Sequence, residues 1–292
     1  MIRPTLSDPG QALRDLMAQD TVVLPGVYDA ITSVAAYKSG FSGLYLSGAA
    51  LTNSQLGVPD IGLATLTEFA SQASRICQAV PLPVLSDADT GFGENWNVAR
   101  SVMELERSGL AGIHIEDQVM PKKCGHLDGK ELISPLEMAQ KVASAVQAKR
   151  SSSFIVMART DAKGVEGLSS AIDRAKRYVD AGADAVFPEG LATEGEFEAF
   201  RGAVQVPLLA NMTEFGKTPL ISVDTFRQLG YEMVIFPVSA MRIALKAVLA
   251  FYAELHSTGT QRAMLDRMST RQELYSLVDY ADYVSSDTNL TP

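Results

Sequence analysis

The sequence of 292 residues predicts a single (β/α)8 barrel with additional C-terminal helices. Three observations lead to this fold class. Eight short apolar runs recur along the chain, the segments between them have helical periodicity, and no linker or low-complexity tract divides residues 15 to 255. A strand followed by a helix, repeated eight times, implies parallel strands covered by helices, for which a closed barrel is the economical arrangement. A doubly wound open sheet is the alternative.

The eight predicted strands are rich in β-branched and aliphatic residues. In chain order they are "TVVLPG" (21–26), "GLYLSG" (43–48), "PVLSDAD" (83–89), "AGIHIED" (111–117), "FIVMART" (154–160), "AVFPEG" (185–190), "PLLANM" (207–212) and "MVIFPV" (233–238). Segments such as "NWNVARSVMELERSG" and "LSSAIDRAKRYVDAG" lie between them and predict helices. Several of these segments end in a glycine suited to a left-handed helix cap.

The tail of the chain departs from the repeat. After "AMRIALKAVLAFYAELHSTG" comes the amphipathic "QRAMLDRMSTRQELYSLVDYADYV", and no ninth strand remains for it to follow. Its Leu, Met and Tyr positions need a surface to cover, and a neighbouring subunit is a reasonable one. We therefore expect one domain over 1–292, with 255–292 as a C-terminal helical extension.

The composition restricts the classes of partner. Hydrophobic residues make up 47% and charged residues 20%, as in soluble globular proteins. A formal net charge of -9 opposes nucleic acid as a partner. No apolar run of about 18 residues and no signal-like start are present, which predicts no membrane partner and a cytoplasmic location. Cys77, in a helical segment, and Cys124, in a polar loop, do not form a disulfide framework.

The predicted strands end in polar residues. In a barrel the catalytic groups come from the C-terminal ends of strands and the loops that follow them. Apolar strands that end in charged groups are costly unless those groups are solvated, paired or bound to a ligand. The polar ends are Tyr45, Ser47, Asp87, Asp89, Glu116, Asp117, Arg159, Asp161, Glu189, Asn211, Thr213, Glu214, Ser239 and Arg242. Their convergence on one barrel mouth indicates a functional site.

"SDADTGFG" predicts a metal site. Asp87 and Asp89 are two residues apart, so on a strand both side chains point toward one ligand. Two close carboxylates repel unless a cation or a proton lies between them. Oxygen ligands without His or Cys favour Mg2+, with Mn2+ as the second choice, and Glu116 would contribute through water. The alternative is a pair of loop-capping aspartates beside Gly91 and Gly93.

"MPKKCGHLDGK" (120–130) places a thiol in a cationic loop. Lys122 and Lys123 beside Cys124 would favour its thiolate, and His126 could relay a proton. Such a thiol suits general acid and base catalysis. A nucleophilic Cys-His pair and an inert loop cysteine are the alternatives.

Two arginines end predicted strands. A planar guanidinium holds a carboxylate with two hydrogen bonds, so Arg159 and Arg242 predict a small di- or tricarboxylate substrate. For each arginine the alternative is an ion pair with a neighbouring acid such as Asp161 or Glu189. The sequence context of His114 and His256 favours structural roles.

Several motifs together resemble those of the isocitrate lyase and phosphoenolpyruvate mutase superfamily. They are "LPGVYDAITSVAA", "YLSG", "DADTGFG", "HIEDQVMPKKCGH", "MARTDA", "FPEG", "ANMTEFGKTPL", "FPVSAMR" and "TRQELY", and they span about nine tenths of the chain. "KKCGH" is typical of the lyase branch, and the 2-methylisocitrate lyases are the most similar group within it. The resemblance implies Mg2+-dependent cleavage of 2-methylisocitrate to pyruvate and succinate, in the methylcitrate cycle of propionate catabolism. It also implies a homotetramer that swaps its C-terminal helices.

The resemblance also implies roles for matching residues. Tyr45 would be the base for the substrate alcohol and Cys124 the proton donor to the succinate carbanion, with Lys122, His126 and Arg159 stabilising the charge. Asp87 and Asp89 would bind Mg2+, with Glu116 holding its water. The implied substrate contacts are Ser47, Gly48, Ala49, Asp60, Gly125, Arg159, Glu189, Asn211, Thr213 and Arg242.

One departure from the lyase pattern concerns substrate identity. "SGAA" stands where methylisocitrate lyases often have "SGGG", so Ala49 and Ala50 replace glycines near the pyruvate site. A 2,3-dimethylmalate lyase, which shares the "KKCGH" loop, is therefore an alternative. A phosphonomutase of the carboxyphosphonoenolpyruvate type and a catalytically silent binder of small acids are further alternatives on the same scaffold.

Overall fold

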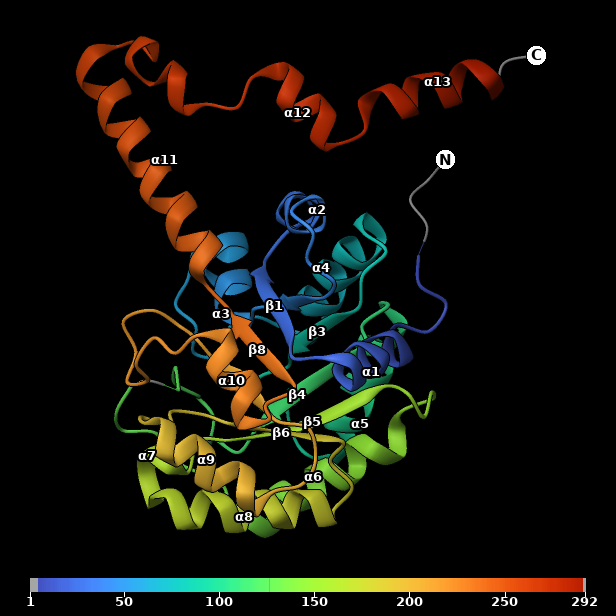
Figure 1. Cartoon of the computed structure of the whole chain (residues 1–292), viewed down its shortest axis with the longest axis vertical. Coiled ribbons are helices and arrows are strands. Elements are labelled where there is room, and N and C mark those ends of the chain that lie inside the picture. Colours follow the sequence, from blue (N-terminus) through green and yellow to red (C-terminus); the bar gives the residue numbers. More distant parts are fainter. Residues whose placement is uncertain (1–4, 126, 291–292) are drawn as a thin grey trace.

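Eight parallel strands form the centre of the computed structural model, which describes residues 5–125 and 127–290 (Figure 1). They are β1 (Val22–Val27), β2 (Leu44–Leu46), β3 (Val84–Asp87), β4 (Gly112–Glu116), β5 (Ile155–Thr160), β6 (Ala185–Pro188), β7 (Leu209–Asn211) and β8 (Met233–Phe236). Each lies within, or within one residue of, a predicted apolar run. All residues of β3 to β6 are buried, as expected for parallel strands covered on both faces.

The strands close into a barrel. Their order is β6-β5-β4-β3-β2-β1-β8-β7, so the first strand pairs with the last, with Val22 opposite Met233. An isolated parallel bridge between Val186 and Leu208 joins β6 to the start of β7. An open doubly wound sheet would leave two edges free. The predicted (β/α)8 barrel is confirmed.

Helices follow the strands and cover the outside of the barrel. The helices of the body are α1 (Pro9–Gln19), α2 (Ala30–Lys38), α3 (Gly48–Leu51), η1 (Thr52–Leu56), α4 (Leu66–Ala79), α5 (Asn95–Arg107), α6 (Pro135–Ala148), α7 (Lys163–Glu166), α8 (Leu168–Asp180), α9 (Glu194–Ala203) and α10 (Val223–Leu229). Local sequence explains several of their starts, because Thr65 and Ser134 form capping boxes with Glu68 and Glu137. Gly230, at φ +78°, ends α10 in the left-handed conformation.

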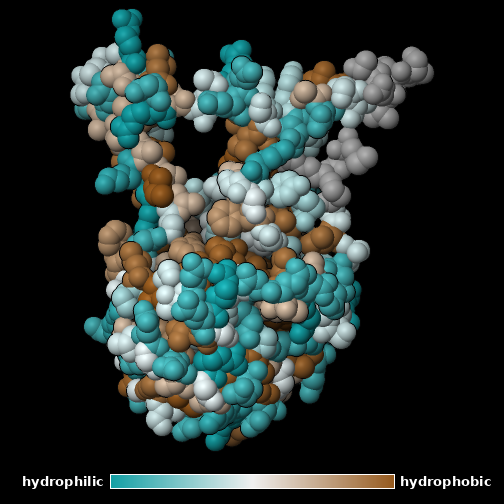
Figure 2. All heavy atoms as spheres, viewed as in Figure 1, coloured by the Kyte–Doolittle hydropathy of each residue, from teal (hydrophilic) through white to brown (hydrophobic). Residues whose placement is uncertain are grey.

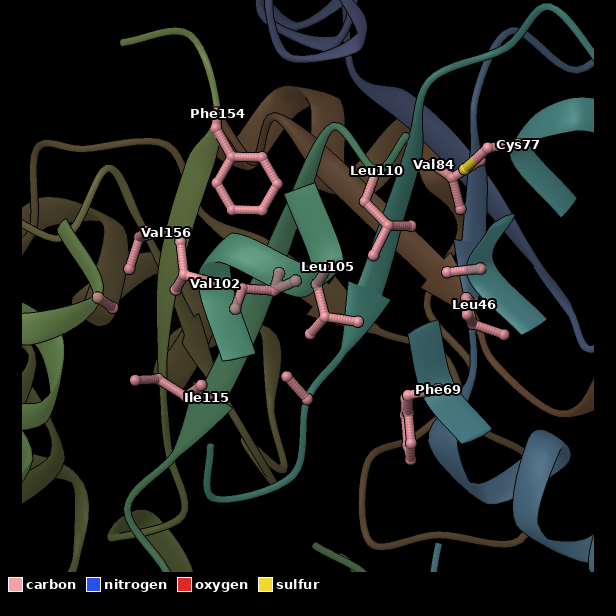
Figure 3. Packing of buried hydrophobic residues seen from close by; sticks show 14 of the residues in the cluster. Leu46, Phe69, Cys77, Val84, Val102, Leu105, Leu110, Ile115, Phe154 and Val156 are labelled. Atoms are coloured by element: carbon pink, nitrogen blue, oxygen red, sulfur yellow. The ribbon is translucent and has the colours of Figure 1, made fainter. Parts of the chain in front are cut away.

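Two layers of apolar side chains hold the body together. Leu24, Tyr45, Met157, Phe187 and Ile235 belong to the cluster that fills the barrel interior. A second cluster lies between the strands and the surrounding helices; Figure 3 shows part of it, with Leu105 and Val102 of α5 facing the strands. The packed interior leaves the ends of the strands as the place for polar groups.

Helix α1 covers the N-terminal end of the barrel. Its Leu13 is fully buried in the interior cluster. Gly10 approaches the backbone that leads into β5 so closely that a Cβ would lie 2.6 Å from the carbonyl carbon of Ser153. Arg14 donates to Asp184, just before β6, at 2.7 Å. The opposite end of the barrel, where the polar residues gather, is therefore the end available for a site.

The C-terminal helices leave the body. Helix α11 (Ser239–Thr258) projects away from the barrel and is followed by η2 (Arg262–Arg267), α12 (Arg271–Leu277) and α13 (Tyr280–Leu290) (Figure 1). We call residues 239–290 the arm; the predicted extension, 255–292, begins in the last turns of α11. Figure 2 shows a gap between parts of the arm and the body. An ion pair of 2.6 Å between Lys38 and Asp279 joins the far part of the arm to α2. Among the described helices, none is long and apolar enough to cross a membrane.

Candidate active site

A cavity of about 230 Å3 lies at the C-terminal ends of the strands. Pockets for drug-sized ligands are typically about 300–1,000 Å3, so this smaller cavity suits a molecule smaller than those ligands. The loop after β4 and the ends of β2, β3, β5, β6, β7 and β8 all contribute to its wall. The lining residues are Tyr45, Ser47, Ala49, Asn53, Asp60, Asp87, Lys122, Cys124, Gly125, Arg159, Phe187, Glu189, Asn211, Thr213, Ile235, Pro237, Val238, Met241 and Arg242.

Asp87 presents a carboxylate to the cavity from the last position of β3. One of its oxygens, Oδ1, accepts a hydrogen bond of 2.9 Å from the backbone N–H of Asp89. The other, Oδ2, faces Gly48, where a Cβ would lie only 2.6 Å away. Gly48 is thus required for space: any side chain there would displace the carboxylate.

Asp89 differs from its predicted orientation. The sequence predicts that Asp87 and Asp89 point toward one ligand, but β3 ends at Asp87, so strand alternation does not extend to Asp89. Asp89 instead takes a left-handed φ of +46° and lies 2.9 Å from the ammonium of Lys122. Lys122 also pairs with Asp60 at 2.5 Å. Asp87 lines the cavity, while Asp89 lies behind it in an ion-pair cluster.

Arg159 lies at the centre of the buried charges. Its Nη1 is 2.9 Å from Glu116 and its Nε is 3.0 Å from Asp161. Glu189 lies 3.7 Å from Nη2. Although burial opposes a charge here, these three carboxylates raise the pKa of Arg159 well above its usual value. The guanidinium is held in a fixed orientation at the cavity wall.

Buried carboxylates outnumber buried cations around the cavity. The carboxylates are Asp87, Asp89, Glu116, Asp161 and Glu189, and the cations are Lys122, Lys130 and Arg159, which leaves a formal surplus of two negative charges. Burial raises the pKa of Glu116 well above its usual range and that of Asp89 to about 7. A proton or a cation among these oxygens would compensate the surplus.

The oxygen atoms present fit a divalent cation. Oε1 of Glu116 is fully buried and accepts no hydrogen bond from any described residue, and Asp87 lines the cavity. Carboxylate oxygens are the ligands that Mg2+ and Mn2+ prefer. Within residues 5–125 and 127–290, no three side chains of His, Cys, Asp or Glu gather as a ready-made metal cluster. Water or substrate would therefore have to complete the coordination of such an ion.

Tyr45 and His114 form a buried neutral pair. The Tyr45 hydroxyl lies 2.7 Å from Nε2 of His114, and the two rings stack at an interplanar angle of 10°. Burial raises the pKa of Tyr45 well above its usual value and lowers that of His114 to about 4. Both side chains are uncharged at neutral pH, so a proton can pass between them without separating charge over a long distance.

The loop after β4 brings Cys124 to the cavity. An antiparallel bridge between Gln118 and Leu132 closes the base of this loop, and the Gln118 side chain holds the backbone of Lys123 through bonds of 2.8 and 2.9 Å. Cys124 is exposed and lines the cavity. A Cβ on Gly125 would lie 2.3 Å from Cγ of Glu189. The loop therefore packs directly on the cavity wall.

The lysines beside Cys124 are directed elsewhere. The sequence predicts that Lys122 and Lys123 act on the thiol. Lys122 instead lies between Asp60 and Asp89, and Lys123 donates to the carbonyl oxygen of Gly129 at 2.5 Å. Each ammonium is paired with a nearby oxygen because its side chain is long enough to reach one. The predicted relay residue His126 lies outside the described residues.

The end of β7 and the first turn of α11 supply amide and guanidinium donors. Asn211 donates from Nδ2 to Glu189 at 3.0 Å. Arg242 donates to the carbonyl oxygen of Glu214 at 2.6 Å and pairs with its carboxylate at 3.0 Å. The side chain of Arg242 remains 40% exposed. This guanidinium is therefore accessible at the rim of the cavity, unlike the buried Arg159.

Comparison with known proteins identifies the family. A model of the family described as phosphoenolpyruvate phosphomutase matches residues 13–256. The chain belongs to the phosphoenolpyruvate mutase/isocitrate lyase superfamily. It is 53% identical to a 2-methylisocitrate lyase from Aeropyrum pernix, over all of this chain and 94% of that protein.

Solved structures of superfamily members have the same architecture. A 2,3-dimethylmalate lyase is 34% identical, with a TM-score of 0.92 over 99% of this chain and 97% of the other. A phosphonopyruvate hydrolase in complex with oxalate and Mg++ is 26% identical, with a TM-score of 0.88 over 98% and 100% of the two chains. The fold is therefore that of this superfamily.

The structure brings together most residues that the superfamily resemblance singles out. At the cavity wall lie Tyr45, Ser47, Ala49, Asp60, Asp87, Lys122, Cys124, Gly125, Arg159, Glu189, Asn211, Thr213 and Arg242. Gly48 lies beside Asp87, while Asp89 and Glu116 are buried behind the wall. His256, in the last turn of α11, is exposed and is not among the residues that line the cavity.

Several residues at or beside this candidate site were not among the predicted site residues. The sequence predicts a structural role for His114, yet its imidazole contacts the Tyr45 hydroxyl. Asn53 and Met241 line the cavity, and Lys130 is buried beside it. Asn53 lies on η1 after β2, and Met241 lies on α11 after β8. The prediction considered only strand ends and the loops that follow them, so it did not include residues on helices. A single sequence offers no signal that Lys122 and Lys130 of the loop after β4 are buried while Lys123 is exposed.

Proposed function

We propose that this chain cleaves 2-methylisocitrate to pyruvate and succinate. The observation that carries this proposal is the 53% identity to a 2-methylisocitrate lyase over the whole chain. Identity to the 2,3-dimethylmalate lyase and to the phosphonopyruvate hydrolase is lower, at 34% and 26%. The position of Cys124 at the cavity also supports a lyase, since the reaction needs a proton donor at that place.

The reaction moves two protons and breaks one carbon–carbon bond. The alcohol of the substrate loses its proton, the bond between the alcohol carbon and its neighbour breaks, and pyruvate forms. The electron pair of that bond stays on the neighbouring carbon as a carbanion, which takes a proton to become succinate. In this proposal Cys124 supplies that proton, because a thiol is a stronger acid than the hydroxyl groups at the cavity.

Tyr45 receives the alcohol proton in this mechanism. Because burial keeps its phenol un-ionised, Tyr45 can take that proton only while passing its own onward. Nε2 of His114, 2.7 Å from the hydroxyl, is the acceptor within reach. The pair therefore acts as a short relay, and the other ring nitrogen of His114, Nδ1, lies 3.7 Å from Oδ1 of Asp87.

Positive and polar groups orient the carboxylates of the substrate. Arg159 and Arg242 both present guanidinium groups at the cavity wall, which Asn211 and Thr213 also line. Ser47, Gly48, Ala49, Asp60, Gly125 and Glu189 complete the proposed contacts. Lys122 and His126 would add positive charge or a proton near the carbanion.

Asp87 would hold Mg2+, or Mn2+ in its place, with Asp89 and Glu116 acting through water. The surplus of buried carboxylates and the Mg++ in the phosphonopyruvate hydrolase complex support this assignment. When bound, the ion would polarise the oxygens of the pyruvate half and stabilise the charge that develops on them.

The proposal includes a homotetramer in the cytoplasm that works in the methylcitrate cycle of propionate catabolism. The exposed apolar residues of the arm support an assembly, because a soluble monomer rarely exposes so extended an apolar surface. Helices of the arm would exchange between subunits. The low cysteine content agrees with a reducing compartment.

The test is pyruvate release, coupled to lactate dehydrogenase, from 2-methylisocitrate, 2,3-dimethylmalate and isocitrate, each with Mg2+ and with EDTA. We expect a strong preference for 2-methylisocitrate that EDTA abolishes. Preference for 2,3-dimethylmalate would mean that Ala49 and Ala50 mark a changed pocket. No pyruvate from any of the three would refute a lyase, and phosphorus NMR on phosphonate substrates would then test the mutase alternative.

A further inference from the structure

Lys130 is a buried ammonium beside the active site that the mechanism above does not use. Only 3% of its side chain is exposed. Its Nζ lies 3.1 Å from Oδ1 of Asp161 and also donates to the carbonyl oxygen of Gly125. Burying a lysine is costly unless its charge is paired and its donors are used. Asp161 and the Gly125 carbonyl oxygen meet that requirement, because they pair the charge and use two of the donors of Nζ.

The two partners of Lys130 belong to different parts of the site. Gly125 directly follows Cys124 in the loop after β4. Asp161 directly follows β5 and binds Arg159 through both carboxylate oxygens, at 3.0 and 3.3 Å. Lys130 thus links the backbone beside the proposed proton donor to the carboxylate that orients the buried arginine.

Asp161 is itself firmly fixed. Its backbone N–H donates to Asp117 at 2.9 Å, and it is fully buried. Any displacement of the Cys124 segment would therefore break the contact between Lys130 and Gly125, because the Asp161 end does not move with the loop. On the other side, Gly125 packs against Glu189 and Arg159. The segment is held from two directions.

We propose that Lys130 is a positioning residue that clamps the Cys124–Gly125 segment against Asp161 and Arg159. The inference rests on the proposed lyase function and adds a residue to it. Proton donation requires the thiol at a fixed place relative to the carbanion, and a misplacement of about 1 Å costs roughly 100-fold in rate. Loss of the clamp should therefore lower kcat more than it changes KM.

The same loop offers a matched control. Lys217 pairs with Asp128 at 2.5 Å, so it too joins the loop to another part of the mouth. That pair is exposed, with 40% and 91% of the two side chains accessible. Exposed ion pairs contribute little. Lys217→Met removes a loop-anchoring ammonium of the same length without touching the buried clamp.

The experiment compares Lys130→Met, Lys130→Arg and Lys217→Met in the full-length protein. Two readouts are measured: kcat and KM for 2-methylisocitrate with Mg2+, and amide hydrogen exchange of a peptide covering residues 118–125 in the absence of substrate. For Lys130→Met we expect kcat to fall roughly 100-fold with KM within about threefold. Exchange in the peptide should rise roughly tenfold while the strands of the barrel stay protected. Lys130→Arg should recover most of both, and Lys217→Met should resemble the parent protein.

Wild-type kcat in Lys130→Met, or unchanged exchange of residues 118–125, would overturn the clamp. A uniform rise of exchange across the barrel would also overturn it, because that result indicates a general stabilising role. If the parent protein releases no pyruvate, the lyase proposal fails, yet the exchange experiment still decides the clamp. If Lys130→Met does not fold, Lys130→Gln takes its place, because an uncharged and shorter amide cannot hold both partners; values equal to those of Lys217→Met would then count against the proposal.

Discussion

Arg159 shows how the charged side chains of this site are prepared before a ligand arrives. Glu116 and Asp161 fix its guanidinium through contacts of 2.9 and 3.0 Å, and both carboxylates are fully buried. A substrate carboxylate would therefore meet a donor whose orientation is already set. Pre-set donors favour the developing charge of a transition state because they need no reorganisation during the reaction.

Cys124→Ser tests the proton donor at the residue scale. Because a serine hydroxyl is a far weaker acid than a thiol, we expect kcat to fall by roughly 100- to 10,000-fold while KM changes little. Steady-state pyruvate release measures both constants. Cys77→Ala is the matched control, since Cys77 is buried in the outer core and burial raises its thiol pKa to about 12. Near-normal turnover of Cys124→Ser would remove this residue from proton transfer.

Gly125→Ala tests the close packing of the loop on the cavity wall. The new Cβ would lie 2.3 Å from Cγ of Glu189 and 2.7 Å from Nη2 of Arg159, so the loop or the arginine must shift. We expect kcat to fall at least roughly tenfold, with little change in melting temperature, as measured by kinetics and thermal unfolding. Gly202→Ala, which meets no atom within 4 Å, should leave activity unchanged. Equal activity in the two variants would contradict the packing described here.

At the scale of elements, a buried polar network joins β4, β5 and α8. Asp117, which follows β4, accepts from the hydroxyls of Thr160 and Tyr178, both at 2.8 Å. Arg174 of α8 lies 3.4 Å from the same carboxylate and pairs with Glu166 at 2.6 Å. Mainly because of burial, the pKa of Asp117 is raised. Each lost partner therefore leaves a buried acid less well satisfied.

Tyr178→Phe tests this network. Removing one hydroxyl that donates to a buried carboxylate should lower the free energy of unfolding by about 1–3 kcal/mol. Urea denaturation followed by circular dichroism measures the change. Tyr37→Phe is the control, because Tyr37 is 39% exposed and such surface substitutions usually change stability by no more than about 0.5 kcal/mol. An equal effect of the two substitutions would show that Asp117 does not depend on Tyr178.

The predictable parts of this protein are those that depend on local composition. All eight strands were predictable because buried parallel strands are short runs of Val, Ile and Leu between polar ends. The arrival of Tyr45, Asp87 and Arg159 at one cavity follows from the barrel alone. The orientation of Asp89 was not predictable, since it depends on a left-handed φ beyond the end of the strand. The burial of Lys130 was not predictable either, because it depends on a contact that the loop makes with β5.

On the scale of the whole molecule, the arm is the feature that needs a partner surface. All residues of α11 are described and none of them is buried. Ile243, Leu249, Tyr252 and Leu265 are each more than half exposed. Figure 2 shows apolar side chains along the arm and on the part of the body beneath it. A second copy of the chain is the partner we propose for this surface.

A double substitution on α11 tests the proposed assembly. In Leu249→Glu with Tyr252→Glu, two apolar side chains that are 59% and 60% exposed become charged. We expect the molar mass from light scattering after gel filtration to fall below that of the parent, because charges at a buried contact are costly. Lys246→Glu changes the charge of the same helix without removing apolar surface and should keep the parent mass. A monomeric parent protein would refute the homotetramer.

Helix α1 closes the N-terminal end of the barrel. Leu13 and the close approach of Gly10 to Ser153 close this end of the barrel. In the proposed reaction the substrate would therefore enter, and both products would leave, at the opposite end, beside Cys124. The product nearer the open end of the cavity would have to leave before the deeper product. Departure is then sequential, and the two products should inhibit differently: the last to leave competes with substrate for the empty enzyme, whereas the first does not.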